Sequence, residues 1–220
     1  MRRSSWFALV LCLVPAASLA APGSHTAPYK EFHDQMARFY GQGHDRLALR
    51  LSVQPAKDDQ PLASPVSMLV TAPEGTVPLA IGDDNEVDIP YRADWLAAGA
   101  SVTVNQAPGT YNMKAQIGMK VPAGTTRLAY ADVKAAFDQF DRLIENEAGV
   151  ASFLAPSAKT LRLFCGVDCT VTLEGTKGSR VLRADARGRV NIPNDKALAK
   201  ENPVLNVSRP VAYTVLTTKG

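Results

Sequence analysis

The sequence contains little histidine, the commonest side-chain ligand of metal ions. Its 220 residues include only three histidines, His25, His33 and His44. A zinc site needs three or four converging ligands, and these histidines share neither a helix face nor a short motif. We therefore predict no metal ion and no other cofactor. The sequence also has no G-x-S-x-G motif, which argues against the nucleophile elbow of the α/β-hydrolases.

An apolar run long enough to cross a bilayer, about 20 residues, is also missing. The apolar segment near the N-terminus, Trp6–Val14, has only nine residues. Arg2 and Arg3 precede it and small residues lead up to Ala20, which is the pattern of a cleaved secretory signal peptide. We predict that residues 1–20 are this signal and that the protein is periplasmic or secreted. A retained membrane anchor is the alternative, and no later segment is predicted to span a membrane.

Neither sign of charge dominates the composition. The chain has 24 Lys and Arg against 21 Asp and Glu, and the predicted signal carries two of the basic residues and none of the acidic ones. Cleavage would therefore leave a net charge of +1. Proteins that hold a nucleic-acid backbone usually carry a basic face or stripe. Since the sequence has none, we predict no nucleic-acid partner.

Cysteine is scarce as well, and only Cys165 and Cys169 lie outside the predicted signal. Export would place them where disulfides persist, and the Gly and Asp between them suit a tight hairpin. We predict a structural disulfide, with two free thiols or a redox or copper site as alternatives. The pair resembles the C-x3-C pair of exported copper-delivery proteins with a thioredoxin-like fold. Those proteins place it on a strand-to-helix loop beside a proline, and here it lies between two predicted strands.

Two segments have the period of an amphipathic helix, residues 29–40 and Tyr130–Gly149. The same apolar spacing recurs in both, as Tyr29, Phe32, Met36 and Phe39 and then as Tyr130, Val133, Phe137 and Phe140. Strands with alternating apolar and polar residues follow each helix, beginning with Leu47–Val53. We expect the aromatic stripes to be core residues that pack each helix on a sheet.

The order of predicted elements suggests an internal duplication. Val87-Asp-Ile-Pro90 in the first part matches Val190-Asn-Ile-Pro193 in the second, between strands and helices of the same order. The predicted fold is mainly β with α (α+β), a tandem repeat of a helix followed by a small antiparallel β-sandwich. The predicted boundaries are a signal peptide at 1–20, a flexible leader at 21–28, a first unit at 29–121, a linker at 122–126 and a second unit at 127–220.

Opposite charges gather at the two matching turns. Four carboxylates crowd the turn of the first unit, and arginines occupy the turn of the second: Asp83, Asp84, Glu86 and Asp88 against Arg187 and Arg189. The acidic turn lacks the glycine of an EF-hand calcium loop. Two solvated hairpin tips are one interpretation. The alternative is that the tips form an interaction site, either with each other or with a partner.

The signal peptide, the Tyr130–Gly149 helix and the two V-x-I-P strands resemble a family of uncharacterised exported proteins of Gram-negative bacteria, a domain of unknown function. The resemblance brings no catalytic motif and implies no catalytic residue. We therefore expect a non-enzymatic periplasmic protein that binds or scaffolds an unknown component of the cell envelope. The alternatives are a periplasmic hydrolase that uses the clustered carboxylates and a thiol or copper protein that uses the cysteine pair.

Overall fold

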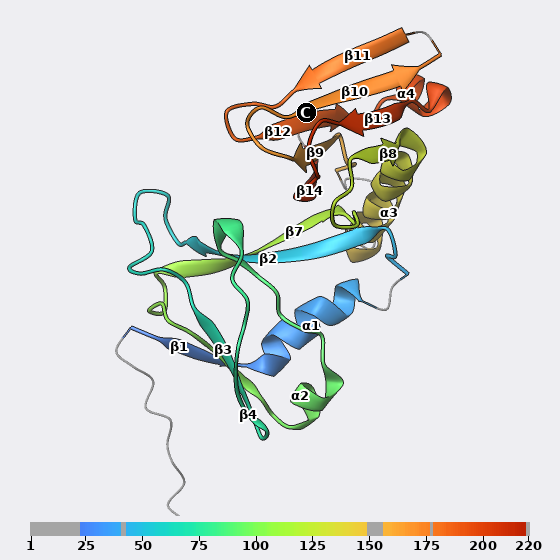
Figure 1. The fold of residues 1–220 in the computed structure, drawn as a ribbon. Helices are drawn as coiled ribbons and strands as arrows, with labels where there is room; N and C mark the ends of the chain where they lie inside the picture. The colour runs from blue at the N-terminus through green and yellow to red at the C-terminus, as the bar shows by residue number, and fades with distance from the viewer. Residues whose placement is uncertain (1–22, 41–42, 149–155, 177, 219–220) are drawn as a thin grey trace, which may run out of the picture.

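The computed structural model describes residues 23–40, 43–148, 156–176 and 178–218, so the predicted signal peptide lies outside the described residues. Within the described residues the fold is mainly β with some α, with four small antiparallel sheets and four α-helices. Figure 1 shows the two halves of the chain stacked one above the other. No helix in the described part is long and apolar enough to cross a membrane.

The first half contains seven strands, two α-helices and one 3-10 helix, which are, in chain order, β1 (His25–Pro28), α1 (Tyr29–Phe39), β2 (Leu47–Pro55), β3 (Met68–Ala72), β4 (Gly75–Pro78), η1 (Asp83–Asn85), β5 (Glu86–Val87), α2 (Ala93–Ala97), β6 (Ser101–Val104) and β7 (Tyr111–Met119). The second half contains β8 (Arg127–Ala129), α3 (Tyr130–Ala148), β9 (Thr160–Phe164), β10 (Thr170–Gly175), β11 (Gly178–Arg183), β12 (Arg189–Pro193), α4 (Lys196–Glu201), β13 (Val204–Val207) and β14 (Tyr213–Thr217).

Each half forms one four-stranded and one three-stranded sheet. In the first half the strand orders are β1-β6-β3-β4 and β5-β2-β7. In the second half they are β11-β10-β13-β8 and β12-β9-β14. All of the pairings are antiparallel.

The N-terminal strand β1 corrects one prediction. The segment 21–28 was expected to be a flexible leader, but His25–Pro28 pairs with β6 from His25 opposite Val104 to Pro28 opposite Ser101. A side-chain contact strengthens the pairing, since Thr26 Oγ1 lies 2.8 Å from Thr103 Oγ1. His25 Nδ1 lies 2.7 Å from the Tyr111 hydroxyl and so links β1 to β7 of the other sheet. The Ser, Thr and Pro residues of this segment are typical of a loop. An edge strand tolerates such residues because one side of its backbone needs no ladder partner.

Two clusters of buried side chains form the core. In the first half, α1 and α2 pack with residues from both sheets, and Tyr29, Val53, Val70 and Val102 are fully buried. In the second half, the stripe on α3 is buried in the core, as predicted, in a cluster with residues of both sheets. Its four residues are almost inaccessible to solvent: Tyr130, Val133, Phe137 and Phe140. Phe39, Leu47 and Met119 of the first half also join the second cluster, so the two halves share core.

The two halves meet where edge strand β7 packs against edge strand β14. Thr214 Oγ1 donates to the Met119 carbonyl at 2.9 Å and accepts from the Met119 N–H at 2.7 Å. A Cβ on Gly118 would lie 2.1 Å from the Thr214 carbonyl oxygen, so only glycine permits this approach. On the other side of the junction, α3 binds the loop before β2 through Asp132, which pairs with Arg46 at 2.6 Å.

We predict that Gly118→Ala separates the strands at the junction and lowers the free energy of unfolding by about 1–3 kcal/mol, as overpacking does. Urea unfolding followed by circular dichroism measures this loss. Gly82→Ala is the control, because its new Cβ would meet its neighbours at 3.8–4.0 Å. Equal stability of the two variants would contradict the close packing of β7 on β14.

Candidate functional site

A cavity of about 650 Å3 lies between the two halves, on the polar faces of the two three-stranded sheets. Its walls come from η1, β2, β5 and β7 on one side and from β9, β12, β14 and the turn before β12 on the other. The lining residues are Arg50, Leu51, Ser52, Gln54, Asp84, Asn85, Glu86, Lys114 and Gln116 of the first half and Arg162, Phe164, Arg187, Arg189, Tyr213 and Val215 of the second.

Strand alternation explains why these side chains meet. In β9, the buried Leu161 and Leu163 face the core, so Arg162 and Phe164 point to the opposite face. In β2, Leu51 and Val53 are buried in the same way, and Arg50 and Ser52 lie on the cavity side. The polar face of each sheet, which is solvated in an isolated sheet, thus becomes one wall of the cavity.

Arg50 is a largely buried cation of the cavity. Its side chain is 10% exposed, and its Nε and Nη2 both donate to the Glu86 carboxylate. The guanidinium carbon lies 3.3 Å from the centre of the Tyr213 ring, so the ring of the second half covers the cation of the first. Burial works to lower the pKa of Arg50, but the interactions with Glu86 and Tyr213 outweigh it and raise that pKa. The remaining nitrogen, Nη1, is buried and has no hydrogen-bond partner among the described residues.

Tyr213 holds several of these groups in place. Its ring stacks on Phe164 at 4.1 Å with the planes 19° apart, and Arg50 covers the opposite face. Its hydroxyl donates to Asp84 Oδ2 at 2.9 Å, across the junction. Burial, helped by the neighbouring Asp84, raises the pKa of Tyr213. Because both faces of the ring are occupied, Tyr213 orients its neighbours and offers no free surface for a ligand to stack on.

The turn before β12 is held by Asp185. Its Oδ1 accepts the backbone N–H groups of Arg187 at 2.9 Å and Arg189 at 3.1 Å, and its Oδ2 accepts Arg189 Nε at 2.8 Å. These bonds, the one from the Arg189 side chain first, lower the pKa of Asp185 to about 2. The turn therefore presents the Arg187 side chain to the cavity from a fixed backbone.

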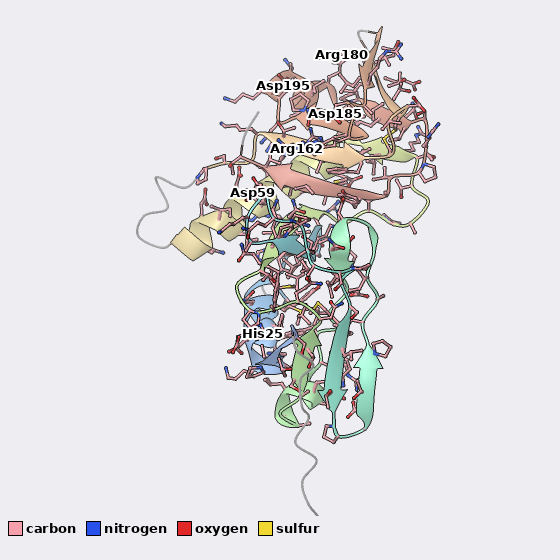
Figure 2. All side chains as sticks on the ribbon, turned by 90° about the vertical axis from the view of Figure 1, so that its left-hand side faces the viewer. His25, Asp59, Arg162, Arg180, Asp185 and Asp195 are labelled. Carbon is pink, nitrogen blue, oxygen red and sulfur yellow. A yellow bond between two sulfur atoms is a disulfide. The ribbon has the colours of Figure 1, made fainter. Side chains whose placement is uncertain are left out.

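Three further cations line the cavity with no carboxylate beside them. Within the described residues, the side chains of Lys114, Arg162 and Arg187 make no hydrogen bond or ion pair. Figure 2 places Arg162 in the part of the second half nearest the first, with Arg180 at the far end. The cavity thus contains two kinds of cation. Arg50 and Arg189 are paired with carboxylates, whereas in the described part of the chain Lys114, Arg162 and Arg187 are not.

The structure brings four of the six predicted tip residues to this cavity, Asp84, Glu86, Arg187 and Arg189. Asp88 is exposed and does not line it, and the side chain of Asp83 lies outside the described residues. No ion pair joins the acidic tip to the basic tip among the described residues, because Glu86 bonds Arg50 and Arg189 bonds Asp185. Sequence reasoning missed Arg50, Lys114, Arg162, Phe164 and Tyr213, although their alternation with apolar residues was visible.

The two cysteines lie next to the turn that forms part of the cavity wall. Cys165 and Cys169 form a disulfide, and both are buried. The Cys165 N–H donates to the Gly188 carbonyl at 3.2 Å, so the disulfide loop packs on the turn that carries Arg187. Gly188 has a φ of 71°, and a Cβ there would lie 2.9 Å from the backbone of Gly166. Among the described residues, no three His, Cys, Asp or Glu side chains gather in a group that could hold a metal ion.

We predict that Arg189→Ala raises the pKa of Asp185 from about 2 toward its ordinary value of 3.8, because it removes the strongest of the bonds to the carboxylate. Since the native pKa is the lower one, the bonds of Asp185 stabilise the fold above about pH 4 and are lost as the pH falls toward 2. A carboxyl-detected NMR titration measures the change. Arg180→Ala, at the far end of the second half, is the control. An unchanged pKa in Arg189→Ala would contradict the pairing.

Comparison with known proteins gives a family but no function. A family model described as a protein of unknown function (DUF2987) matches residues 24–164. The matched range contains the whole first half and continues through α3 to the end of β9. No curated protein and no solved structure matches the chain. Because the matched residues make up more than half of the sequence, the chain belongs to the DUF2987 family of proteins of unknown function.

Proposed function

We propose that the protein is an exported, non-enzymatic binding protein of the cell envelope, made of two copies of one unit that hold a ligand in the cavity between them. The observation that carries the proposal is the cavity itself, walled by the polar faces of two three-stranded sheets from different halves. Ligand sites commonly lie between domains, in clefts of about 300–1,000 Å3. The volume of about 650 Å3 falls within that range.

The strand orders support the duplication. The four-stranded order β1-β6-β3-β4 corresponds, element by element, to β8-β13-β10-β11, and β5-β2-β7 corresponds to β12-β9-β14. In each half the long helix follows the first strand. The short helix comes directly before the strand that pairs with that first strand, β6 with β1 and β13 with β8. The buried residues of the first half come from both of its sheets, as they do in a small β-sandwich.

Two tyrosines at the helix starts make the same contacts. The Tyr29 hydroxyl donates to the Pro90 carbonyl at 2.6 Å and accepts the Arg92 N–H at 2.9 Å. The Tyr130 hydroxyl donates to the Pro193 carbonyl at 2.7 Å and accepts the Asp195 N–H at 2.9 Å. Each tyrosine therefore ties its helix to the proline of a V-x-I-P segment. This explains physically why both residue types recur at the same place.

The pairing registers supply the matching positions within the cavity. Leu51 lies opposite Val87, and Leu163 lies opposite Val190, so the two leucines are equivalent. The residues before them, Arg50 and Arg162, are then equivalent too. The corresponding edge strands β7 and β14 also meet each other, which is the contact that an approximate two-fold axis produces. The cavity thus lies where the two copies join.

Two further observations favour an exported binding protein over the alternatives. The disulfide fits an oxidising compartment. Two of the four carboxylates that a hydrolase would use are already engaged, Glu86 by Arg50 and Asp84 by Tyr213. A copper or redox role would need free thiols, and both sulfurs are joined in the disulfide.

We predict that Tyr29→Phe and Tyr130→Phe each lower the free energy of unfolding by about 1–3 kcal/mol, because each leaves a backbone N–H and a carbonyl without a partner. Denaturant unfolding of the two variants measures the losses. Tyr91→Phe is the control, since Tyr91 is 45% exposed. A loss in only one of the two variants would contradict the equivalence of the tyrosines.

We predict that Gln116→Trp, which fills the cavity from β7, removes a compound that the wild-type protein retains when it is recovered from the periplasmic fraction. Native mass spectrometry measures the retained mass. Arg180→Trp adds the same ring on β11, away from the cavity, and should retain the compound. Recovery of the protein from the cytoplasm, or identical spectra for wild type and Gln116→Trp, would contradict the proposed function.

A further inference from the structure

Equivalent positions of the two halves carry opposite charges in the cavity. On β5 and β12, the residue one position before the matched Val87 and Val190 is Glu86 in the first half and Arg189 in the second. The same offset makes Asp84 equivalent to Arg187. Both members of each pair line the cavity.

Because of this exchange of charge, only one of the two equivalent arginines, Arg50 and Arg162, is paired with a carboxylate among the described residues. Arg50 of the first half is bound by Glu86 through two nitrogens. The equivalent neighbour of Arg162 is Arg189, and the residue directly opposite Arg162 on β12 is Asn191. Arg162 therefore has no carboxylate on its neighbouring strand. The first half neutralises its own arginine, and the second half does not.

The lining as a whole is left with excess positive charge. It contains five cations, Arg50, Lys114, Arg162, Arg187 and Arg189, and two carboxylates, Asp84 and Glu86. Arg189 is further neutralised by Asp185 from behind the wall. Like charges gathered in a concave site repel one another, and an anionic ligand relieves that repulsion.

An unsatisfied donor on the opposite wall gives a second, independent sign of a ligand. Arg50 is nine-tenths buried, and its Nη1 has no hydrogen-bond partner among the described residues. Buried polar groups are nearly always satisfied by protein or by a bound molecule.

We propose that the cavity binds a small soluble compound with at least two oxyanion groups, either phosphate or carboxylate. The inference rests on the proposed function and specifies its ligand. Arg162 and Arg187 hold one group through their planar forks, which match the geometry of both oxyanions. Lys114, on the facing wall, holds the other as a point charge. Arg50 is a positioning residue that keeps the first-half wall and the Tyr213 ring in register.

Size and charge distribution favour a small ligand over a polymer. The cations are concentrated in a cavity of about 650 Å3, whereas proteins that bind a polyanion present a basic stripe along their surface. The excess charge of the cavity is also compensated elsewhere, because the whole sequence carries a formal charge of only +3. The site therefore selects a compound that fits between the halves.

The test is calorimetric titration of the exported full chain with pyrophosphate and, separately, with citrate. We expect saturable binding of at least one, weakened about tenfold to a hundredfold by Arg162→Ala and by Arg187→Ala, as for a lost charge-assisted bond. Lys114→Gln is a milder third variant in case an arginine variant unfolds. Arg180→Ala is the control and should bind as wild type does. The two titrants separate phosphate from carboxylate as the preferred group.

The outcomes separate this inference from the proposed function. If neither titrant binds, and the compound lost from Gln116→Trp carries no anionic group, the cavity is a binding site and the anion inference is wrong. If a titrant binds equally well to wild type, Arg162→Ala and Arg187→Ala, the inference is also wrong. If Gln116→Trp loses nothing and binds the titrants as wild type does, the proposed function itself fails.

Discussion

The contact between β7 and β14 is the constraint on which the rest of the structure depends. Gly118 allows the backbone of one edge strand to approach the carbonyl of Thr214 on the other, and Thr214 makes two hydrogen bonds to Met119. Edge strands normally need protection from other chains. Here each protects the other. Because both three-stranded sheets are fixed by this contact, their polar faces line one cavity between the halves.

The chemistry of the cavity follows from that arrangement. In water the polar face of a sheet is solvated. When a second charged face lies opposite it, loss of that solvation costs free energy unless the charged groups pair with one another or with a ligand. The first half uses Glu86 to pair Arg50, and Tyr213 to cover it. The second half leaves Arg162 unpaired among the described residues. The two walls, each a three-stranded antiparallel sheet, therefore carry different charges.

The sequence predicted a large part of the fold through periodicity. The stripes at Tyr130, Val133, Phe137 and Phe140 are buried, and the disulfide between Cys165 and Cys169 is present. The strand β1 was not predictable from a Ser-, Thr- and Pro-rich segment, because its partner β6 lies far along the chain. The alternation of polar and apolar residues in β2 and β9 places Arg50 and Arg162 on the polar faces of their sheets. Only the packing of one half on the other, which no local pattern encodes, shows that these residues share a cavity.

The position of β1 has a consequence for the order in which the chain can fold. His25 pairs with Val104, and in the second half Arg127 pairs with Asn206, so each four-stranded sheet is closed by a strand from the start of its half and another from near the end. A chain that leaves a ribosome or a translocation pore from its N-terminus cannot complete either sheet until almost the whole half has emerged. Long-range pairings of this kind slow folding. During that interval the segment that later becomes β1 has no strand to pair with.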